Sequence, residues 1–246
     1  GRLATPTIAG EVRVAVTEGI GTFWLAPRLV EFQRAFPNIL VDLHCAMRSA
    51  DVLRHEADVA IQLVRPSALD VKAVRLGRLH VMWYASQSYI ELYGKPSTYE
   101  ELAKHRIVMQ FSDQTGADEA FQEWFPGMRH EDLLVMRTNV SSANYWAIAK
   151  GAGIGLLPTY GSAIGARVEP LDIDGMHRPF DIWLSYHPDA GRIPRVRKMI
   201  DWIVESFSAA HFPWFSDTFI HPNELSTLYK GKPLVNMFEG FSAAAG

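Results

Sequence analysis

The chain has 246 residues, of which 48% are hydrophobic and 21% charged, and its formal net charge is −3 with a pI near 6.3. This length and composition are typical of a soluble protein with one large domain or two lobes. The balance of charge gives no sign of the basic face that binding to phosphate groups requires, so we expect this chain not to contact DNA directly. The single cysteine, Cys45, excludes an internal disulfide and favours a reducing, cytoplasmic location. No apolar run reaches the roughly 18 residues of a membrane span, so we expect no membrane partner.

The first third of the chain alternates between strand and helix patterns. Alternating valines predict a strand over 12–16, and further apolar runs predict strands over 39–43 and 58–63. A helical stripe of apolar residues begins near Pro27 and ends at Pro37, and a short helix is predicted over 50–55. This order of elements predicts a parallel sheet with right-handed crossovers.

The same alternation continues to Phe207. Ser97 and Glu100 have the spacing of a capping box and predict the start of a helix. Strands are predicted over 80–85, 106–111, 133–138, 154–158 and 181–186, and helices over 117–125, 142–150 and 196–207. The tail 208–246 is rich in aromatic residues and proline, has weak periodicity and receives no assigned role.

Three alternating glycines at 151, 153 and 155 lie in the segment AIAKGAGIGLLPTY. A dinucleotide fingerprint needs a strand, then the glycine loop, then a helix. Here the helix precedes the strand, and the third position of G-x-G-x-x-G holds Leu156 or Pro158 in either possible frame. The sequence instead predicts a helix C-cap at Gly151, followed by a strand that passes close to its neighbour.

Several segments resemble the effector-binding domain of LysR-type transcriptional regulators, in the family's order. SSANYWAIAKGAGIGLLP resembles the family's helix followed by "aGxGIa-lP", and GEVRVAV with LAPRLVEFQRAFPNI resembles its opening "G-vrig … LaplLaeF---yP-i". ADVAIQL is similar to its "lDlai" strand, and VRLGRLHVMWYASQSYIELYGKPSTYEELAKHRIV to its "rLg---lvlvAspaYLa--G-P-tpedLa-Hrci" segment. WLSYHPDAGRIPRVRKMIDWI resembles the closing strand and helix, so the resemblance covers about residues 10–207.

The resemblance implies an α/β fold like the type 2 periplasmic-binding proteins, with two lobes around a ligand cleft. Lobe one would comprise residues 10–84 and 187–207, and lobe two residues 85–186. The chain would cross between the lobes near 84–86 and 186–187. Residues 1–9 would form a lead-in and residues 208–246 a C-terminal extension. The family's N-terminal winged helix-turn-helix does not occur in this sequence. The segment between Leu43 and Asp58, which contains Arg48 and Ser49, is shorter than the family pattern, so we expect its helix to be about one turn shorter.

Ligands of such sheets lie at the carboxyl ends of strands and at helix N-termini. Mapping those ends and the family positions onto the chain gives a set of candidate ligand-binding residues. They are Thr17, Gly21, Thr22, Phe23, Arg48, Ser49, Gln62, Arg65, Gln110, Asn139, Ser141, Ser142 and Thr159.

Each candidate also has a purely structural explanation. Thr22, Ser141 and Ser142 suit helix N-caps. Phe23 and Trp24 suit core packing. Arg48 and Arg65 suit solvated surface charges, whereas Gln62 ends an apolar strand and favours a buried polar role at the cleft.

Enzyme and metal sites have little support in the sequence. No G-x-S-x-G elbow and no H-E-x-x-H pair occurs, so we expect neither catalytic residues, nor a metal, nor a cofactor. The resemblance implies a small-molecule effector, for which we expect an organic or aromatic acid. It also implies a homodimer or homotetramer, and promoter DNA reached only through a separate N-terminal domain. A free solute-binding protein of the same fold and, with less support, an enzyme on this scaffold are the alternatives.

Overall fold

The computed structural model describes residues 7–48, 56–231 and 234. The described chain forms two compact units. Unit 1 is Gly1–Arg78, Ser112–Thr115 and Phe180–Asp217, and unit 2 is Leu79–Phe111, Gly116–Pro179 and Thr218–Gly246. The lobe boundaries expected near 84–86 and 186–187 stay a prediction.

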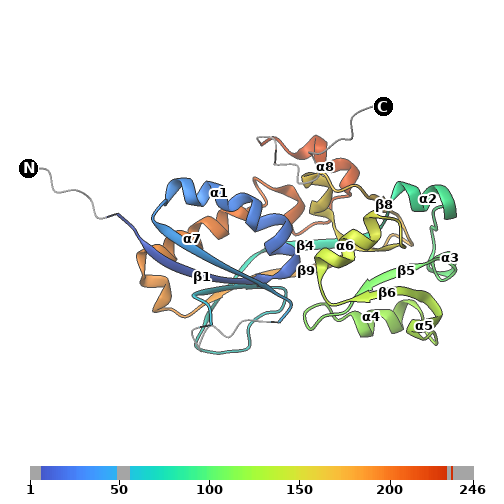
Figure 1. The fold of residues 1–246 in the computed structure, drawn as a ribbon, viewed down its shortest axis with the longest axis horizontal. Coiled ribbons are helices and arrows are strands. Elements are labelled where there is room, and N and C mark those ends of the chain that lie inside the picture. Colours follow the sequence, from blue (N-terminus) through green and yellow to red (C-terminus); the bar gives the residue numbers. More distant parts are fainter. Residues whose placement is uncertain (1–6, 49–55, 232–233, 235–246) are drawn as a thin grey trace, which may run out of the picture. The chain divides into compact units, whose positions relative to one another are not determined.

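The element order is mixed α/β throughout (Figure 1). The strands are β1 (Gly10–Thr17), β2 (Ile39–Ala46), β3 (Val59–Gln62), β4 (Lys72–Ala85), β5 (Ile107–Gln110), β6 (Leu134–Thr138), β7 (Gly155–Pro158), β8 (Glu169–Leu171) and β9 (Arg178–Tyr186). The α-helices are α1 (Ala26–Ala35), α2 (Gln87–Tyr93), α3 (Tyr99–Leu102), α4 (Ala117–Trp124), α5 (His130–Leu133), α6 (Ser141–Ala149), α7 (Pro194–Ser206) and α8 (Pro222–Leu228). A π-helix, η1 (Ile20–Leu25), and the 3-10 helices η3 (Thr159–Ile164), η4 (Ala190–Arg192) and η5 (Pro213–Phe215) complete them.

Unit 1 is built on a sheet in which β1 has parallel neighbours on both sides. β1 pairs in parallel with β2 and with β3, which confirms the parallel arrangement predicted for the first three strands. The apolar face of β1 is buried, and α1 and α7 lie on the same side of it (Figure 1), with the rings of Phe32 and Trp202 5.8 Å apart. β9 closes the far side of β3 in the antiparallel direction.

The helix after β1 begins earlier than the sequence pattern predicts. The chain is helical from Glu18, and the Ala26 N–H donates to the carbonyl of Gly21, five residues earlier, as in a π-helix. The start predicted near Pro27 is confirmed for α1, which begins at Ala26 with Pro27 in its first turn, whereas the helical residues before it were not predicted. A wider π turn does not follow the 3.6-residue period, so the apolar stripe of the sequence becomes visible only from Leu25 onward.

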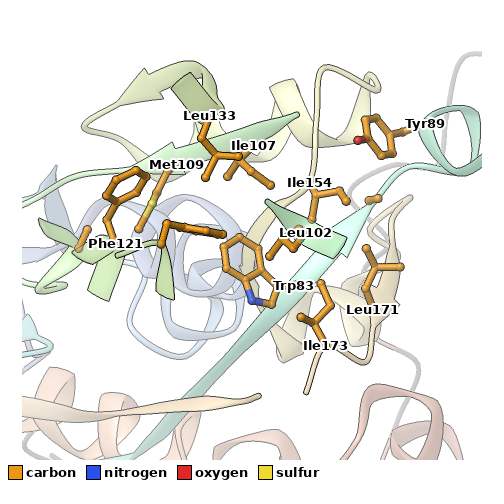
Figure 2. Packing of buried hydrophobic residues seen from close by; sticks show 13 residues of the cluster. Trp83, Tyr89, Leu102, Ile107, Met109, Phe121, Leu133, Ile154, Leu171 and Ile173 are labelled. Atoms are coloured by element: carbon orange, nitrogen blue, oxygen red, sulfur yellow. The ribbon is translucent and has the colours of Figure 1, made fainter. Parts of the chain in front are cut away.

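Unit 2 contains the parallel pair β5 and β6, with α6 on one side and α4 and α5 on the other (Figure 1). Apolar side chains of β5 and α4, including Met109 and Phe121, meet Trp83 of β4 in one buried cluster (Figure 2). The second part of β4 pairs with β7 and β8 in the antiparallel direction. These contacts fix the carboxyl end of β5 beside the start of α6.

The glycine-rich segment has the arrangement that the sequence predicts. Gly151 follows α6 with a φ of +88°, a left-handed conformation that favours glycine, and its N–H donates to the Ile148 carbonyl. β7 begins directly afterwards, so the order is helix, glycines, strand. The segment therefore ends a helix and passes close to β5, and it does not form a phosphate loop.

Other expectations fail in detail. The capping box lies one residue later than predicted, because Thr98 accepts from the Glu101 N–H and the Glu101 carboxylate accepts from the Ser97 N–H. β4 starts at Lys72, well before the predicted strand at 80, while α2, α5 and β8 have no separate prediction. The short helix predicted over 50–55 lies outside the described residues.

The described part of the tail is packed. The rings of Phe212, Trp214 and Phe215 lie 5.1 to 5.6 Å from the Trp24 ring, whose Nε1 donates to the Ser206 carbonyl. Farther along, α8 contacts η3 within unit 2. Among the described residues, no helix is both long enough and apolar enough to cross a membrane.

Candidate functional site

The carboxyl ends of the unit 1 strands carry a buried polar network. The Thr17 side chain at the end of β1 is 4% exposed, and its Oγ1 lies 2.8 Å from Oε1 of Gln114. The same Oε1 accepts from the Leu63 N–H, just after β3, at 2.9 Å. The Gln114 Nε2 donates to the Met47 carbonyl, just after β2, at 2.8 Å. One carboxamide thus joins the ends of three strands, at the edge where parallel sheets bind ligands.

Sequence reasoning missed Gln114. It lies in the polar segment SDQTG between β5 and α4, and contact with unit 1 is a property of the folded chain alone. The one available signal was its place after the carboxyl end of a strand, which also singled out Gln110. That signal identifies the loop, but it does not predict which strand ends the loop contacts in the folded chain.

Gln62 supplies a second buried polar group at this edge. It is 5% exposed, and its Oε1 has no hydrogen-bond partner among the described residues. A buried amide oxygen without a partner is costly, so it calls for a water or a ligand. Gln62 and the exposed Arg48 also line a cavity of about 200 Å³ on the β1–β2–β3 sheet. Ser49, the neighbouring candidate, lies outside the described residues.

The predicted ligand loop after β1 is helical. Gly21 lies against β1 and β2, and a Cβ there would be 2.5 Å from Sγ of Cys45 and 2.6 Å from Cγ1 of Val16, so a larger residue would force these side chains to shift. The Thr22 hydroxyl lies 3.4 Å from a carboxylate oxygen of Glu18, inside the helical run and not at its N-cap. Phe23 is half-buried, whereas Trp24 belongs to the core.

Cys45 faces the same helical turn. Burial raises the pKa of its thiol, and the charge of Glu18 raises it further, while a hydrogen bond with Thr22 opposes both. The thiol is therefore held in its neutral form, which is less nucleophilic than a thiolate.

Arg65 follows β3 and is exposed. Its guanidinium lies 5.1 Å from the centre of the Trp183 ring, in a cation–π contact. The side chain is thereby ordered over an aromatic face of the same unit.

Unit 2 has its own polar group at the end of β5. The Ser141 hydroxyl donates to Oε1 of Gln110 at 3.2 Å, and the Gln110 Nε2 lies 3.5 Å from the Asn139 carbonyl. Val140 is the N-cap of α6 and offers no side-chain cap, so the explanation of Ser141 and Ser142 as N-caps is wrong. Valine has no side-chain oxygen, so the N-cap residue itself offers no side-chain acceptor to the first turn of α6.

Unit 2 has two more buried polar residues, one on α6 and one at the start of η3. Asn144, one turn into α6, is 3% exposed; its Nδ2 donates to the Leu156 carbonyl, and its Oδ1 has no partner among the described residues. Thr159 is 2% exposed at the start of η3. Sequence reasoning named Thr159 and missed Asn144, which was read only as part of a helix.

Within residues 7–48, 56–231 and 234, no three His, Cys, Asp or Glu side chains are grouped so that they could hold a metal ion. The polar groups at both strand edges are hydroxyls, amides and backbone N–H groups. Such groups recognise a ligand by hydrogen bonds and bring no strong nucleophile or base of their own.

Comparison with known families gives a match over most of the chain. The family model of the LysR substrate binding domain matches residues 7–208. An HTH-type transcriptional regulator of Xanthomonas campestris pv. campestris (strain 8004) is 37% identical over 99 residues, which are 40% of this chain and 29% of the relative. The probable HTH-type transcriptional regulator LtrA of Klebsiella pneumoniae is 23% identical over 211 residues, which are 81% of this chain and 67% of that protein. The chain thus spans less than a third of the first of these curated relatives.

Solved structures show the same fold. The regulatory domain of CrgA, a LysR-type transcriptional regulator from Neisseria meningitidis, superposes with a TM-score of 0.68 at 19% identity and covers 80% of this chain and 98% of that one. The effector domain of the transcriptional regulator AmpR of Pseudomonas aeruginosa has a TM-score of 0.62 at 18% identity and covers 80% and 95% of the two chains. At these identities the likeness describes the fold alone.

Proposed function

The chain belongs to the family of LysR substrate binding domains, and we propose that it senses a small-molecule effector for a bacterial transcriptional regulator. One observation carries the proposal: polar groups gather at the carboxyl ends of parallel strands in each unit, buried around Thr17 and Gln62 in unit 1 and half-buried around Ser141 in unit 2. Strand ends and helix starts are where open α/β sheets bind small molecules.

The start of α6 suits an anionic group of the effector. Its first-turn N–H groups carry the positive end of the helix dipole, and Val140 provides no competing acceptor. The Ser141 hydroxyl can turn from Gln110 to a ligand oxygen. We therefore propose that the effector is an organic acid and that Ser141, Ser142 and Gln110 bind its carboxylate. We extend the same proposal to an effector that carries an aromatic group in addition to its carboxylate.

The test is a thermal-shift screen of organic acids, because a ligand that binds the native state stabilises it by mass action. Each acid that raises the melting temperature is titrated against the Ser141→Ala/Ser142→Ala variant. We expect at least a tenfold loss of affinity, about 1.4 kcal/mol for charge-assisted hydrogen bonds, with little change in the melting temperature of the free protein. The matched control is Ser67→Ala, an exposed serine after β3.

Two results would contradict this assignment. If the double variant melts far below the wild type while its affinity holds, the serines serve the fold and not the ligand. If no acid in a broad panel shifts the wild-type melting temperature, the proposal of an acid sensor fails.

Control of transcription belongs to the whole regulator, and we propose that it needs a winged helix-turn-helix segment outside this chain. An effector with unequal affinity for two arrangements of a homodimer or homotetramer would shift their populations, and so the position of the DNA-binding segments on a promoter. The net charge of −3 supports the view that this chain binds duplex DNA no better than nonspecifically. Specific operator binding by the chain alone in a gel-shift assay would contradict it.

The remaining details are proposals of the same kind. Light scattering of the purified chain tests the oligomer. The gene sequence upstream of Gly1 separates a regulator from an exported solute-binding protein, since the first requires a winged helix and the second a signal peptide. A single free cysteine supports a cytoplasmic location.

A further inference from the structure

The Gln114 carboxamide has the position of a bound ligand in unit 1. It is 6% exposed, and it makes three hydrogen bonds of 2.8 to 2.9 Å to the ends of β1, β2 and β3. None of its partners is close in sequence, since 51 residues separate it from Leu63 and 67 from Met47. The segment that brings it, Ser112–Thr115, belongs to unit 1 although the elements on both sides of it belong to unit 2.

The three partners define what chemistry this position accepts. Thr17 Oγ1 and the Leu63 N–H converge on one oxygen, so that atom must be an acceptor. The Met47 carbonyl is an acceptor only, so the atom facing it must be a donor. A planar primary carboxamide has one of each on the same carbon. A carboxylate would place its second oxygen against the Met47 carbonyl, with no hydrogen between them.

We propose that the ends of β1, β2 and β3 form a subsite for a primary carboxamide group of a small-molecule ligand, and that Gln114 occupies it as a built-in competitor. The inference rests on the proposed sensor function and adds a specificity that the acid-binding start of α6 does not supply. A ligand amide and the Gln114 amide make the same bonds, so only one of them can be present at a time.

Occupation by Gln114 gives the subsite a regulatory role. The segment 112–115 leads directly into α4, whose N-cap Gly116 has a φ of +59°. A ligand amide that displaces Gln114 releases the segment 112–115 from the ends of β1, β2 and β3. Since a tethered group competes at a high effective concentration, a free amide binds the wild-type protein more weakly than the emptied subsite.

The test uses propionamide as the probe and the purified chain with Gln114→Ala. The Leu63 N–H reports directly, because its NMR chemical shift responds to the acceptor that replaces Gln114. We expect propionamide to bind the variant about tenfold more tightly than the wild type, as for a subsite that is open in about a tenth of wild-type molecules. Sodium propionate and N,N-dimethylpropionamide, which lack the required donor, should not bind.

Three controls accompany the titration. Thr17→Val added to Gln114→Ala should weaken binding of propionamide about fivefold, because one of the two donors to the oxygen is lost. Gln33→Ala, on the exposed face of α1, should behave as the wild type. If Gln114→Ala does not fold, Gln114→Glu replaces it, since its carboxylate keeps the size of the side chain but removes the donor to Met47.

The inference is overturned if propionamide binds neither variant of Gln114, if it binds them no better than the wild type, or if N,N-dimethylpropionamide binds equally well. Its failure is separable from that of the sensor function. Acid binding that depends on Ser141 and Ser142 would survive an absent amide subsite. Conversely, if no acid binds in the thermal-shift screen, a change in the chemical shift of the Leu63 N–H on adding propionamide would still support the amide subsite.

Discussion

Replacing Gly153 with alanine tests the close approach of the chain between α6 and β7 to the start of β5. Gly153 has an ordinary φ, so the substitution meets no backbone restriction. A Cβ at this position would lie 2.6 Å from the Arg106 carbonyl oxygen and 3.0 Å from the Arg106 carbonyl carbon. Both atoms belong to backbone, which cannot turn away as a flexible side chain does. The added methyl group must therefore push the two segments apart.

The expected loss of stability in Gly153→Ala has two contributions. Overpacking of this kind costs about 1 to 3 kcal/mol. The neighbouring Ile154 N–H donates to the same Arg106 carbonyl at 2.8 Å, and the Val108 N–H donates to the Ile154 carbonyl at 2.9 Å. Weakening one of these hydrogen bonds adds about 1 kcal/mol. We expect Gly153→Ala to lower the free energy of unfolding by about 2 to 4 kcal/mol, at about 2 to 4 °C of melting temperature per kcal/mol for a chain of this size.

Gly161→Ala is the matched control. Gly161 has a φ outside the left-handed region, and a Cβ there would meet the Ala166 Cβ at 3.4 Å, an ordinary contact. Because alanine restricts the unfolded chain, this variant should be about 0.4 to 1 kcal/mol more stable than the wild type. Urea unfolding followed by tryptophan fluorescence and by circular dichroism measures both. The reasoning is refuted if Gly153→Ala is as stable as Gly161→Ala.

Three further predictions test other parts of the structure. Burial raises the pKa of Asp181, but hydrogen bonds from two arginines outweigh burial and lower the pKa overall. The stabilisation is therefore present above the pKa of the unfolded state and is lost as the pH falls through the folded pKa. Asp181→Asn should lower the melting temperature at pH 7, and the difference from wild type should vanish in acid. Phe215→Ala should lower the free energy of unfolding, measured by heat or urea, by about 3 to 5 kcal/mol, because Phe215 is 1% exposed and packs against Trp24. The control Leu228→Ala should be nearly neutral, because Leu228 is 48% exposed. Equal losses of stability in the two variants would contradict the packing of the tail. The raised pKa of Cys45 predicts slow alkylation by iodoacetamide at neutral pH, and Glu18→Gln should speed it by lowering that pKa.

The sequence was sufficient for the local features and for the family. Apolar period and proline placement located most strands and helices, because these signals depend on neighbours within a few residues. The glycines after α6 were interpreted correctly for the same reason: the order of helix and strand is a local property. The π turn was missed because its wider period blurs the apolar stripe, and the capping box was displaced because Ser97 and Thr98 offer the same hydroxyl one residue apart.

The arrangement of the polar groups was decided by tertiary structure. Thr17 and Gln62 were found as strand ends, yet no local pattern shows that Gln114, 97 residues after Thr17, supplies the acceptor for its hydroxyl. In the same way, Val140 as N-cap changed Ser141 from a capping residue into a neighbour of Gln110. The end of a strand is determined by nearby residues. The partners of a buried polar group, in contrast, are the atoms that the folded chain brings within about 3 Å. A hydrogen bond depends on the position and direction of its two groups and not on their separation in sequence.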